Sequence, residues 1–426
     1  MDRGFKKKGA PKLLRIVNGV FFSVFSFVFL YCVQGELLSE AQSVYSNGLT
    51  TYSLLPGALI ITFILMLVQW FVTSVFNFND DYYALSYFPS CLLLGILTSI
   101  DVEVLANFTL GNLVWVLPLI LLLYVGVLFF LKKFSFVRGV NIQKNYAKSL
   151  WVNALILLVM FISVGSYANN NDVFTYELKT ERLIIEGEYD EALEVGKKSL
   201  CSSRKLTELR MFALAKNGTL NDKMFDYPQY YGADGLLDIS DTLSRLYRFS
   251  SKDICAEIGL FSDSGMSTRE YLERAYYIVD SLKFNDEAIT ESTDTANVHE
   301  NINAQMAMDY YCAYLLLDKN IEKFCSLLDS FEAKALPKVY GESVLLAYEN
   351  RTDSIVENQS ELICMTSMQR LYELIDKDVL KQREEYLSIK DSLADSVECM
   401  NRLRRKFGNT YWWYYDYSQQ VSNPVY

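Results

Sequence analysis

The side chains that most often carry catalysis are scarce in this chain. It contains a single histidine, His299, within the polar stretch DEAITESTDTANVHE. One histidine excludes a zinc site built from several histidines and offers no second partner for a charge switch, so we expect a solvated loop residue. The sequence has no GxxxxGK[ST] loop, GxGxxG turn or CxxC pair. We therefore predict no catalytic residues, no cofactor and no metal, and the pattern points away from an enzyme.

The second chemically rich stretch is aromatic. YWWYYDY, residues 411–417, contains six aromatic side chains, among them Trp412, Trp413, Tyr414 and Tyr415. These rings could stack on a ligand, lie at a membrane surface or pack inside the fold. The stretch presents more apolar area than a soluble domain leaves exposed, and the turn at Gly408 lets the chain fold back. We therefore predict that it packs as a cap on the end of its domain.

A basic run, RLRRKF at residues 402–407, comes directly before the aromatic stretch. It could bind an anionic lipid or another polyanion. Cations in the last turn of a helix also complement the helix dipole, and Gly408 stands where a C-terminal cap belongs. The sequence favours this second interpretation, a basic helix end closed by glycine.

Charge divides the chain into two parts. Residues 1–166 carry eleven Lys/Arg and seven Asp/Glu, whereas the remainder carries 29 and 44, a net charge of −15. An acidic part of this size is a poor match for nucleic acid, which is bound largely by neutralising phosphates. We place the domain boundary at residue 167, with a membrane domain over 1–167 and a second domain over 168–426.

The first part contains apolar stretches with the length of membrane helices. A helix needs roughly 20 apolar residues to cross the hydrocarbon core. Five stretches reach or approach that length, namely 16–33, 52–76, 83–100, 113–131 and 150–167. The sequence therefore predicts about five transmembrane helices in contact with membrane lipid. Whether residues 83–100 cross the membrane completely stays open, because this stretch is the shortest and contains Pro89.

The basic residues of the short loops predict the orientation. RGFKKKGAPKLLR precedes the first span and KKFSFVRGVNIQKNYAK separates the fourth from the fifth, whereas residues 35–51 and 101–112 hold no Lys or Arg. With five spans, both basic stretches lie on one side. We therefore expect a multi-pass protein of the bacterial inner membrane, with a cytoplasmic N-terminus, an uncleaved first span and a periplasmic C-terminal domain.

The second part has the pattern of paired helices. In EGEYDEAL, residues 186–193, Gly187, Tyr189 and Ala192 have the spacing of tetratricopeptide (TPR) repeats. In such repeats the glycine allows the turn, the aromatic ring wedges between the helices and the alanine permits close contact. Further helical stretches begin at Lys205, Ser267, Asn303 and Lys338, and a long one runs from Lys377 to the RLRRKF run. We predict an all-α fold in which a TPR-like solenoid of roughly ten helices follows the membrane helices.

Eight cysteines are spaced irregularly, which favours buried thiols over a disulfide framework. One pair differs. Cys312 and Cys325 lie on either side of a predicted turn at residues 318–320, so antiparallel helices would bring them together. The sequence leaves open whether they form a disulfide.

The order of these features resembles a family of uncharacterised Bacteroidales-type membrane proteins, in which a multi-span region leads into a helical-repeat domain. The similar stretches are IIEGEYDEALEVGKKSL, QYYGADGLL, YLERAY, ALPKVYGESVLL and FGNTYWWYYDY. The resemblance implies the same two-part architecture and brings no catalytic residues with it.

Three functions fit this organisation. The favoured one is an interaction or assembly protein that presents a helical scaffold in the periplasm to a protein partner of the cell envelope. The second is a membrane enzyme acting on lipid-linked glycan, with Glu36 or Glu40 of the first outer loop as its carboxylate. The third is a carbohydrate-binding module that uses some of the thirty tyrosines, because aromatic faces suit sugars.

Overall fold

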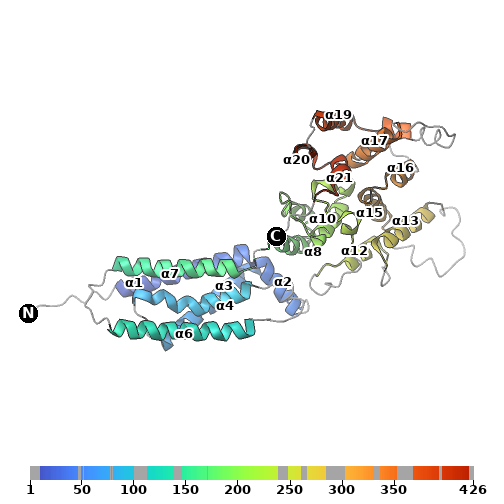
Figure 1. Ribbon diagram of the computed structural model, residues 1–426. Helices are drawn as coiled ribbons and strands as arrows, with labels where there is room; N and C mark the ends of the chain where they lie inside the picture. Colours follow the sequence, from blue (N-terminus) through green and yellow to red (C-terminus); the bar gives the residue numbers. More distant parts are fainter. Residues whose placement is uncertain are drawn as a thin grey trace, which may run out of the picture. The chain divides into compact units, whose positions relative to one another are not determined.

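The computed structural model of the protein describes residues 10–46, 49–50, 52–76, 78, 80–99, 113–137, 146–169, 171–237, 248–260, 266–284, 303–329, 336–352, 368–392 and 396–421. Within these ranges the regular elements are all helices, as the sequence predicts (Figure 1). The chain forms two compact units. One comprises residues 1–171 with 245–248, and the other residues 172–244 with 249–426. We call them the apolar bundle and the C-terminal domain.

Helices that pack in parallel and antiparallel directions form the apolar bundle. Its elements are α1 (Ala10–Val28), the π-helix η1 (Phe29–Val33), α2 (Gly35–Tyr45), α3 (Leu54–Val75), the 3-10 segment η2 (Asp80–Tyr87), α4 (Phe88–Thr98), α6 (Leu113–Val137) and α7 (Tyr146–Tyr167). Three stretches are long and apolar enough to cross a membrane, namely Lys12–Val33, Leu54–Val75 and Ala147–Tyr167. A membrane protein is the natural interpretation of these three helices.

The expected span over residues 83–100 is not one regular helix. Its α-helical part, α4, has only 11 residues, and at about 1.5 Å per residue it covers roughly half of a bilayer core. The preceding η2 segment is kinked at Tyr82. Proline at the second position of α4 fits this arrangement, because the first turn of a helix leaves its amide groups unbonded. The helix α6 extends over 25 residues and continues through Pro118.

Polar side chains hold the irregular segment inside the bundle. The Gln69 side chain of α3 donates hydrogen bonds to the Tyr83 hydroxyl and to Ser86 Oγ, both at 3.0 Å. Asn153 of α7 accepts from the Ala84 amide at 2.5 Å and donates to the Asp80 carbonyl at 2.8 Å. The Asn153 bonds satisfy backbone groups of the 3-10 segment, which is a requirement inside an apolar environment, and the Gln69 bonds pair its polar side chains.

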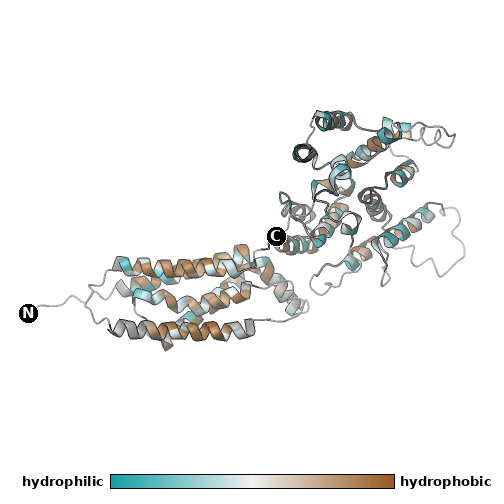
Figure 2. Cartoon of the chain, viewed as in Figure 1, coloured by the Kyte–Doolittle hydropathy of each residue, from teal (hydrophilic) through white to brown (hydrophobic). Residues whose placement is uncertain are grey.

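The outer surface of the bundle is apolar. Large side chains such as Trp70, Phe71, Phe129 and Trp151 are exposed, and Figure 2 shows the hydrophobic colouring that dominates these helices. A soluble protein rarely exposes contiguous apolar area of this kind, so the surface suits lipid.

Contacts between helix ends fix the directions of the passes. At one end, Arg15 of α1 approaches Asp80 of η2 at 3.8 Å, and Ser149 of α7 donates to Asp81 at 2.5 Å. At the other end, the Gln34 side chain donates to the Asn169 carbonyl. The segments α1, η2–α4 and α7 therefore run parallel, whereas α3 and α6 run in the opposite direction (Figure 1).

The C-terminal domain consists of helices and short helical turns. Its elements are α8 (Asp172–Glu186), α9 (Tyr189–Glu194), α10 (Arg204–Lys216), α11 (Leu220–Lys223), η3 (Met224–Asp226), η4 (Gly232–Gly235), α12 (Ser251–Ile258), α13 (Thr268–Phe284), α15 (Ala304–Leu317), α16 (Ile321–Asp329), α17 (Lys338–Thr352), α19 (Lys377–Ser392), α20 (Ser396–Phe407) and α21 (Tyr411–Tyr417). One hydrophobic core runs from Leu183 to Tyr417.

Local signals in the sequence predicted several of these boundaries. Ser267 and Glu270 form the expected capping box of α13, with a Ser267 amide to Glu270 carboxylate distance of 3.0 Å. The predicted turn at residues 318–320 separates α15 from α16, and Lys319 there adopts a left-handed φ of 58°. Cys312 and Cys325 flank this turn as buried thiols rather than as a disulfide.

One expectation about the C-terminal domain is wrong. The long helix predicted from Lys377 is two helices, α19 and α20, which pack against each other and bring Phe407 against Tyr386 at 5.5 Å between ring centroids. Folding back buries apolar faces that a single long helix would leave in water. The expected TPR-like solenoid is not confirmed, and the core joins elements far apart in sequence, because α11 packs on both α15 and α17. The polar stretch with His299 lies outside the described residues.

Candidate functional site

The residues predicted from the TPR spacing form a local helical turn. Gly187 has a left-handed φ of 83° and connects α8 to α9, a conformation that favours glycine. Ala192 is completely buried, and the Tyr189 ring contacts Phe212 of α10 edge-on at 6.3 Å. The second helix of the pair, α9, has only six residues and stops before Gly196.

Gly196 replaces the aromatic residue that a TPR-like pattern would place there. Its φ is 58°, and a Cβ atom at this position would lie 2.6 Å from the Tyr176 ring. Glycine therefore lets the Tyr176 ring pack directly against the backbone that ends α9. These residues shape the start of the C-terminal domain and bring no reactive groups together.

The aromatic stretch 411–417 forms the short helix α21, and most of it is buried. Tyr411 and Trp412 are fully enclosed, Trp413, Tyr414 and Tyr417 are buried, and Tyr415 is partly exposed. The predicted packing inside the fold is confirmed, but the position differs from a cap at the end of a solenoid. Tyr411 and Tyr414 lie against Phe225 of η3 at 5.6 and 5.1 Å between centroids, and Trp412 lies against Tyr386 of α19. The helix α21 thus joins early and late elements of the domain.

Hydrogen bonds fix the N-terminal end of α21. Thr410 Oγ1 accepts a hydrogen bond from the Trp413 amide, as expected for an N-cap residue. Glu342 of α17 accepts from the Tyr411 amide at 2.6 Å, and its own carbonyl accepts from the Trp412 indole at 2.8 Å. The Glu342 side chain is completely buried, and this burial raises the pKa of its carboxyl to about 7.

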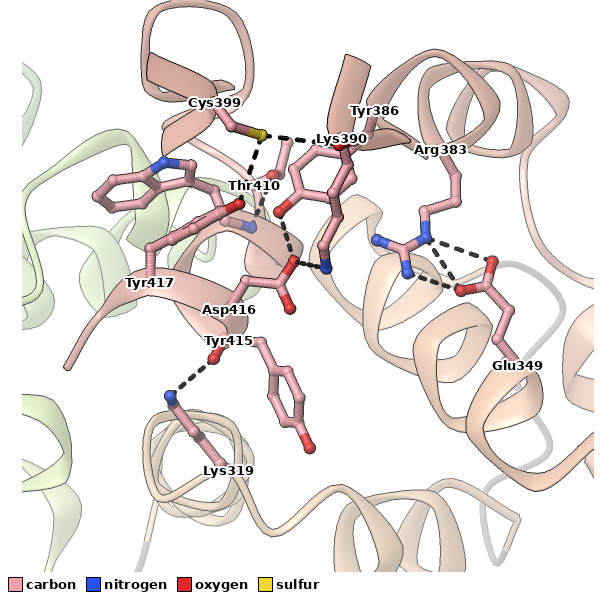
Figure 3. A network of polar contacts seen from close by, with 11 residues as sticks. Lys319, Glu349, Arg383, Tyr386, Lys390, Cys399, Thr410, Tyr415, Asp416 and Tyr417 are labelled. Carbon is pink, nitrogen blue, oxygen red and sulfur yellow. Dashed lines mark hydrogen bonds and ion pairs between the residues drawn. The ribbon is translucent and has the colours of Figure 1, made fainter. Parts of the chain in front are cut away.

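A second group of contacts fixes the other end of α21 (Figure 3). Asp416 accepts hydrogen bonds from the Tyr386 hydroxyl at 2.6 Å and from Lys390 Nζ at 2.7 Å, both on α19. Lys319 Nζ donates to the Tyr415 carbonyl at 2.8 Å, where a cation complements the negative end of the helix dipole. Burial lowers the pKa of Lys319.

Nothing in the sequence pointed to Glu342 or Lys319 as partners of the aromatic stretch. Glu342 lies on α17 and Lys319 in the turn after α15, 69 and 96 residues before the α21 residues that they contact, and no local pattern links them to α21. Only the predicted turn at residues 318–320 could have drawn attention to Lys319. Glu342 carried no such signal, because a carboxylate within a helix is usually solvated.

An open pocket of about 440 Å³ lies beside α21, between the chain after α9, the segment 225–230 and the end of α20. Five basic residues line it, and Asp226 is the one acidic residue in the described lining. The basic residues are Lys197, Lys198, Arg404, Arg405 and Lys406. Aromatic and amide side chains complete the wall, with Tyr227, Gln229, Tyr230, Asn409 and Trp413 among them. We call this the basic pocket.

The basic residues of the pocket differ in their pairing. Arg404 donates to the Tyr230 hydroxyl at 3.2 Å, and its guanidinium carbon lies 5.4 Å from the centroid of the Trp413 ring. Lys197 pairs with Glu194, and Lys406 pairs with Glu385. Lys198 and Arg405 form no ion pair with any of the described residues. The RLRRKF run thus ends α20 before Gly408, as predicted, and also turns cations toward the pocket.

A buried arginine stands behind the pocket wall. Arg210 of α10 is 1% exposed, and its Nη2 donates to the Val195 and Gly196 carbonyls at 3.0 and 3.2 Å. Its guanidinium carbon lies 4.9 Å from the centroid of the Tyr227 ring, which lines the pocket. Nε and Nη1 have no acceptor among the described residues. Burial lowers the pKa of Arg210 to about 10, so the side chain remains a cation at neutral pH.

The two glutamates considered for glycan chemistry lie on α2, so the expected outer loop begins as a helix. Glu36 is half-buried there. Both belong to the apolar bundle, whereas the basic pocket and α21 belong to the C-terminal domain.

Comparison with known proteins gave one result. A model described as a family of unknown function, DUF6057, matches residues 103–277 and 260–418. Curated proteins and solved structures gave no match. The matched residues include α6, α7, most of the basic pocket and α21, and they span most of the chain. The protein therefore belongs to the DUF6057 family of unknown function.

Proposed function

We propose that the protein is a multi-pass membrane protein of the bacterial inner membrane whose C-terminal domain lies in the periplasm and holds a partner of the cell envelope. The observation that carries this proposal is that one chain contains both an apolar bundle with a lipid-compatible surface and an acidic helical domain with a single core. Such a domain presents a broad and rigid surface, which suits binding and assembly.

The ends of the bundle support the orientation. The contacts between Arg15 and Asp80 and between Ser149 and Asp81 gather the starts of α1, η2 and α7 at one end. In the sequence, basic stretches come directly before α1 and before α7, whose starts lie at this end. At the other end, Gln34 and Thr98 both contact Asn169. Residues 35–51 and 101–112, which follow Gln34 and Thr98 in the sequence, hold no Lys or Arg. Five passes with this charge difference put the basic end in the cytoplasm.

Reporter fusions test the orientation. A reporter joined after Gly139 should be active in the cytoplasm, and one joined after Asn171 should be active outside it. Both sites lie in short segments next to helices α6 and α7, so the fusions leave the upstream passes intact. A cytoplasmic signal at Asn171 would contradict the periplasmic location of the C-terminal domain.

Capture of the partner tests the interaction role. Cross-linking in intact cells from positions on the C-terminal domain, followed by detergent extraction, should enrich the same envelope protein from several domain positions and not from the loop near Gly139. Enrichment from both sides equally would indicate random membrane neighbours and would contradict the proposal.

The two alternative functions are tested directly. A glycan enzyme should lose activity with Glu36→Gln or Glu40→Gln. A carbohydrate-binding module needs accessible aromatic faces, and the burial of most of α21 leaves Tyr415 as its one partly exposed ring. No observation in the described residues favours either function over the interaction role.

A further inference from the structure

We propose that the basic pocket binds a phosphate group, carried either by a small soluble phosphate ester or by the headgroup of a lipid. This inference goes beyond the anchoring and interaction role, and it is independent of which partner the C-terminal domain holds.

The first argument is the distribution of charge. The part of the chain that contains the pocket has a net charge of −15. Within that acidic part, the pocket lining holds five basic residues against Asp226. Solvated lysines and arginines repel one another when they are gathered without compensating acids, so the cluster costs stability unless an anion joins it.

The second argument is that part of this charge is not compensated by the protein. Lys198 and Arg405 are exposed and form no ion pair with any residue that the structure describes. Arg210 adds a buried cation behind the Tyr227 ring, with two guanidinium nitrogens that lack an acceptor among the described residues. A desolvated cation close to a concave surface strengthens the local positive potential, because the surrounding protein screens it less than water does.

The third argument is an unused donor in the pocket wall. Trp413 lines the pocket and is 9% exposed, and its indole Nε1 has no acceptor among the described residues. The Gln229 side chain on the opposite segment donates to the Met224 carbonyl at 2.6 Å, and its Oε1 has no donor within the described part of the chain. Buried polar groups are normally hydrogen-bonded, so the unused Trp413 N–H favours a ligand with an acceptor oxygen, as phosphate has. The Gln229 Oε1 needs a donor, which a hydroxyl of the ester part would supply and the phosphate itself would not.

Phosphate fits these features better than a carboxylate does. A phosphate monoester carries nearly two negative charges and three acceptor oxygens, whereas a carboxylate carries one charge. Arginine binds phosphate through paired hydrogen bonds, and lysines add point charges around it. The volume of about 440 Å³ accommodates a phosphate together with a small polar group. Asn409 and Tyr230 could then contact the ester part.

The test uses the full-length protein in nanodiscs of phosphatidylcholine, which carries no net charge. Titration calorimetry would compare glycerol 3-phosphate and inorganic pyrophosphate with glycerol and glutamate. We expect the two phosphates to bind and to weaken steeply with added salt. Glycerol should not bind, and glutamate should bind at least about tenfold more weakly.

Matched variants locate the binding. Lys198→Gln and Arg405→Gln should each weaken phosphate binding roughly tenfold, since each removes one charge-assisted contact. Arg402→Gln removes a cation from the exposed face of the same helix, outside the pocket lining, and should leave the affinity unchanged. All three positions are exposed, so unfolding temperatures should not change, and this is measured alongside.

A change in the lipid composition of the nanodiscs distinguishes a lipid headgroup from a soluble phosphate ester. In nanodiscs containing phosphatidylglycerol, a headgroup in the pocket should compete with soluble phosphate in the wild type. Unchanged affinity would identify a soluble ester instead, and both results support a phosphate site. Equal binding of glutamate would assign the pocket to acidic peptides. That result would overturn the proposal. So would equal losses of affinity with Arg402→Gln and Arg405→Gln, and so would the absence of phosphate binding.

Discussion

At the scale of single residues, the most unusual group in the C-terminal domain is the buried carboxyl of Glu342. Burial raises its pKa from the ordinary value of 4.5 to about 7, although the Tyr411 amide and Lys338 favour the ionised form. The folded domain therefore holds the proton more tightly than the unfolded chain does. The stability that this group contributes is present below about pH 4.5 and is lost as the pH rises through about 7.

The pH dependence of unfolding tests this carboxyl. Between pH 5 and pH 8 the wild-type domain should lose about 2–3 kcal/mol of unfolding free energy from this group. Glu342→Gln, which can still accept from the Tyr411 amide, should flatten the profile. Urea unfolding followed by tryptophan fluorescence is suitable, because Trp412 and Trp413 are the only tryptophans after residue 151.

The control for this variant is Glu384→Gln on the exposed side of α19, which should keep the wild-type profile. A profile that still fell by the same amount in Glu342→Gln would assign the pH dependence to other groups.

Ala192 provides a second prediction at this scale. It is fully buried in α9, so Ala192→Arg forces a long cation into a helix contact and should destabilise the domain by about 3 kcal/mol or more. Glu191→Arg places the same side chain on the exposed face and should change stability little. Urea midpoints of the two variants give the comparison, and equal midpoints would show that Ala192 does not lie in a tight contact.

At the scale of elements, α21 is a short helix with many partners. Seven residues cannot form a stable helix alone in water, so α21 depends on tertiary contacts. Those contacts come from η3, the turn after α15, α17, α19 and α20. Both helix ends are bound by charged side chains, Glu342 at the N-terminal end and Lys319 at the C-terminal end. The helix therefore acts as a central connection within the domain.

Truncation tests this role. Ending the chain after Gly408 removes α21, and each buried aromatic side chain lost costs roughly 3–5 kcal/mol. The total exceeds the stability of an ordinary domain, so we expect loss of the cooperative thermal transition in near-UV circular dichroism. Ending the chain after Val421 retains α21 and should preserve the transition. A cooperative melt at the wild-type temperature after the first truncation would refute the central role of α21.

At the scale of the whole molecule, the two compact units differ in the solvent that suits them. The apolar bundle exposes large apolar side chains, whereas the C-terminal domain buries its own in one core. A domain with its own core can fold by itself. Residues 171–426 expressed alone should therefore be soluble, monomeric and mainly helical, and the acidic net charge should keep the fragment dispersed.

Far-UV circular dichroism and sedimentation measure these properties. A spectrum dominated by strand or coil, or aggregation at neutral pH, would show that the C-terminal domain needs the apolar bundle in order to fold. A control fragment ending after Gly408 should lack the cooperative transition of the complete domain.

Composition and short-range pattern were enough to predict those features that depend on neighbouring residues. The apolar stretches, the helical class, the capping box at Ser267, the turn at Lys319 and the glycine turn at Gly187 all follow from residues close to one another in the chain. The burial of YWWYYDY also followed, because that much apolar surface is rarely left in water.

The three-dimensional fold was needed to show which distant residues meet. It divided the predicted long helix into α19 and α20, brought Glu342 and Lys319 to the two ends of α21, and joined Lys198 to Arg405 in one pocket across two hundred residues. Packing energy decides such contacts, since each local segment is compatible with many partners and only the complete core selects one arrangement.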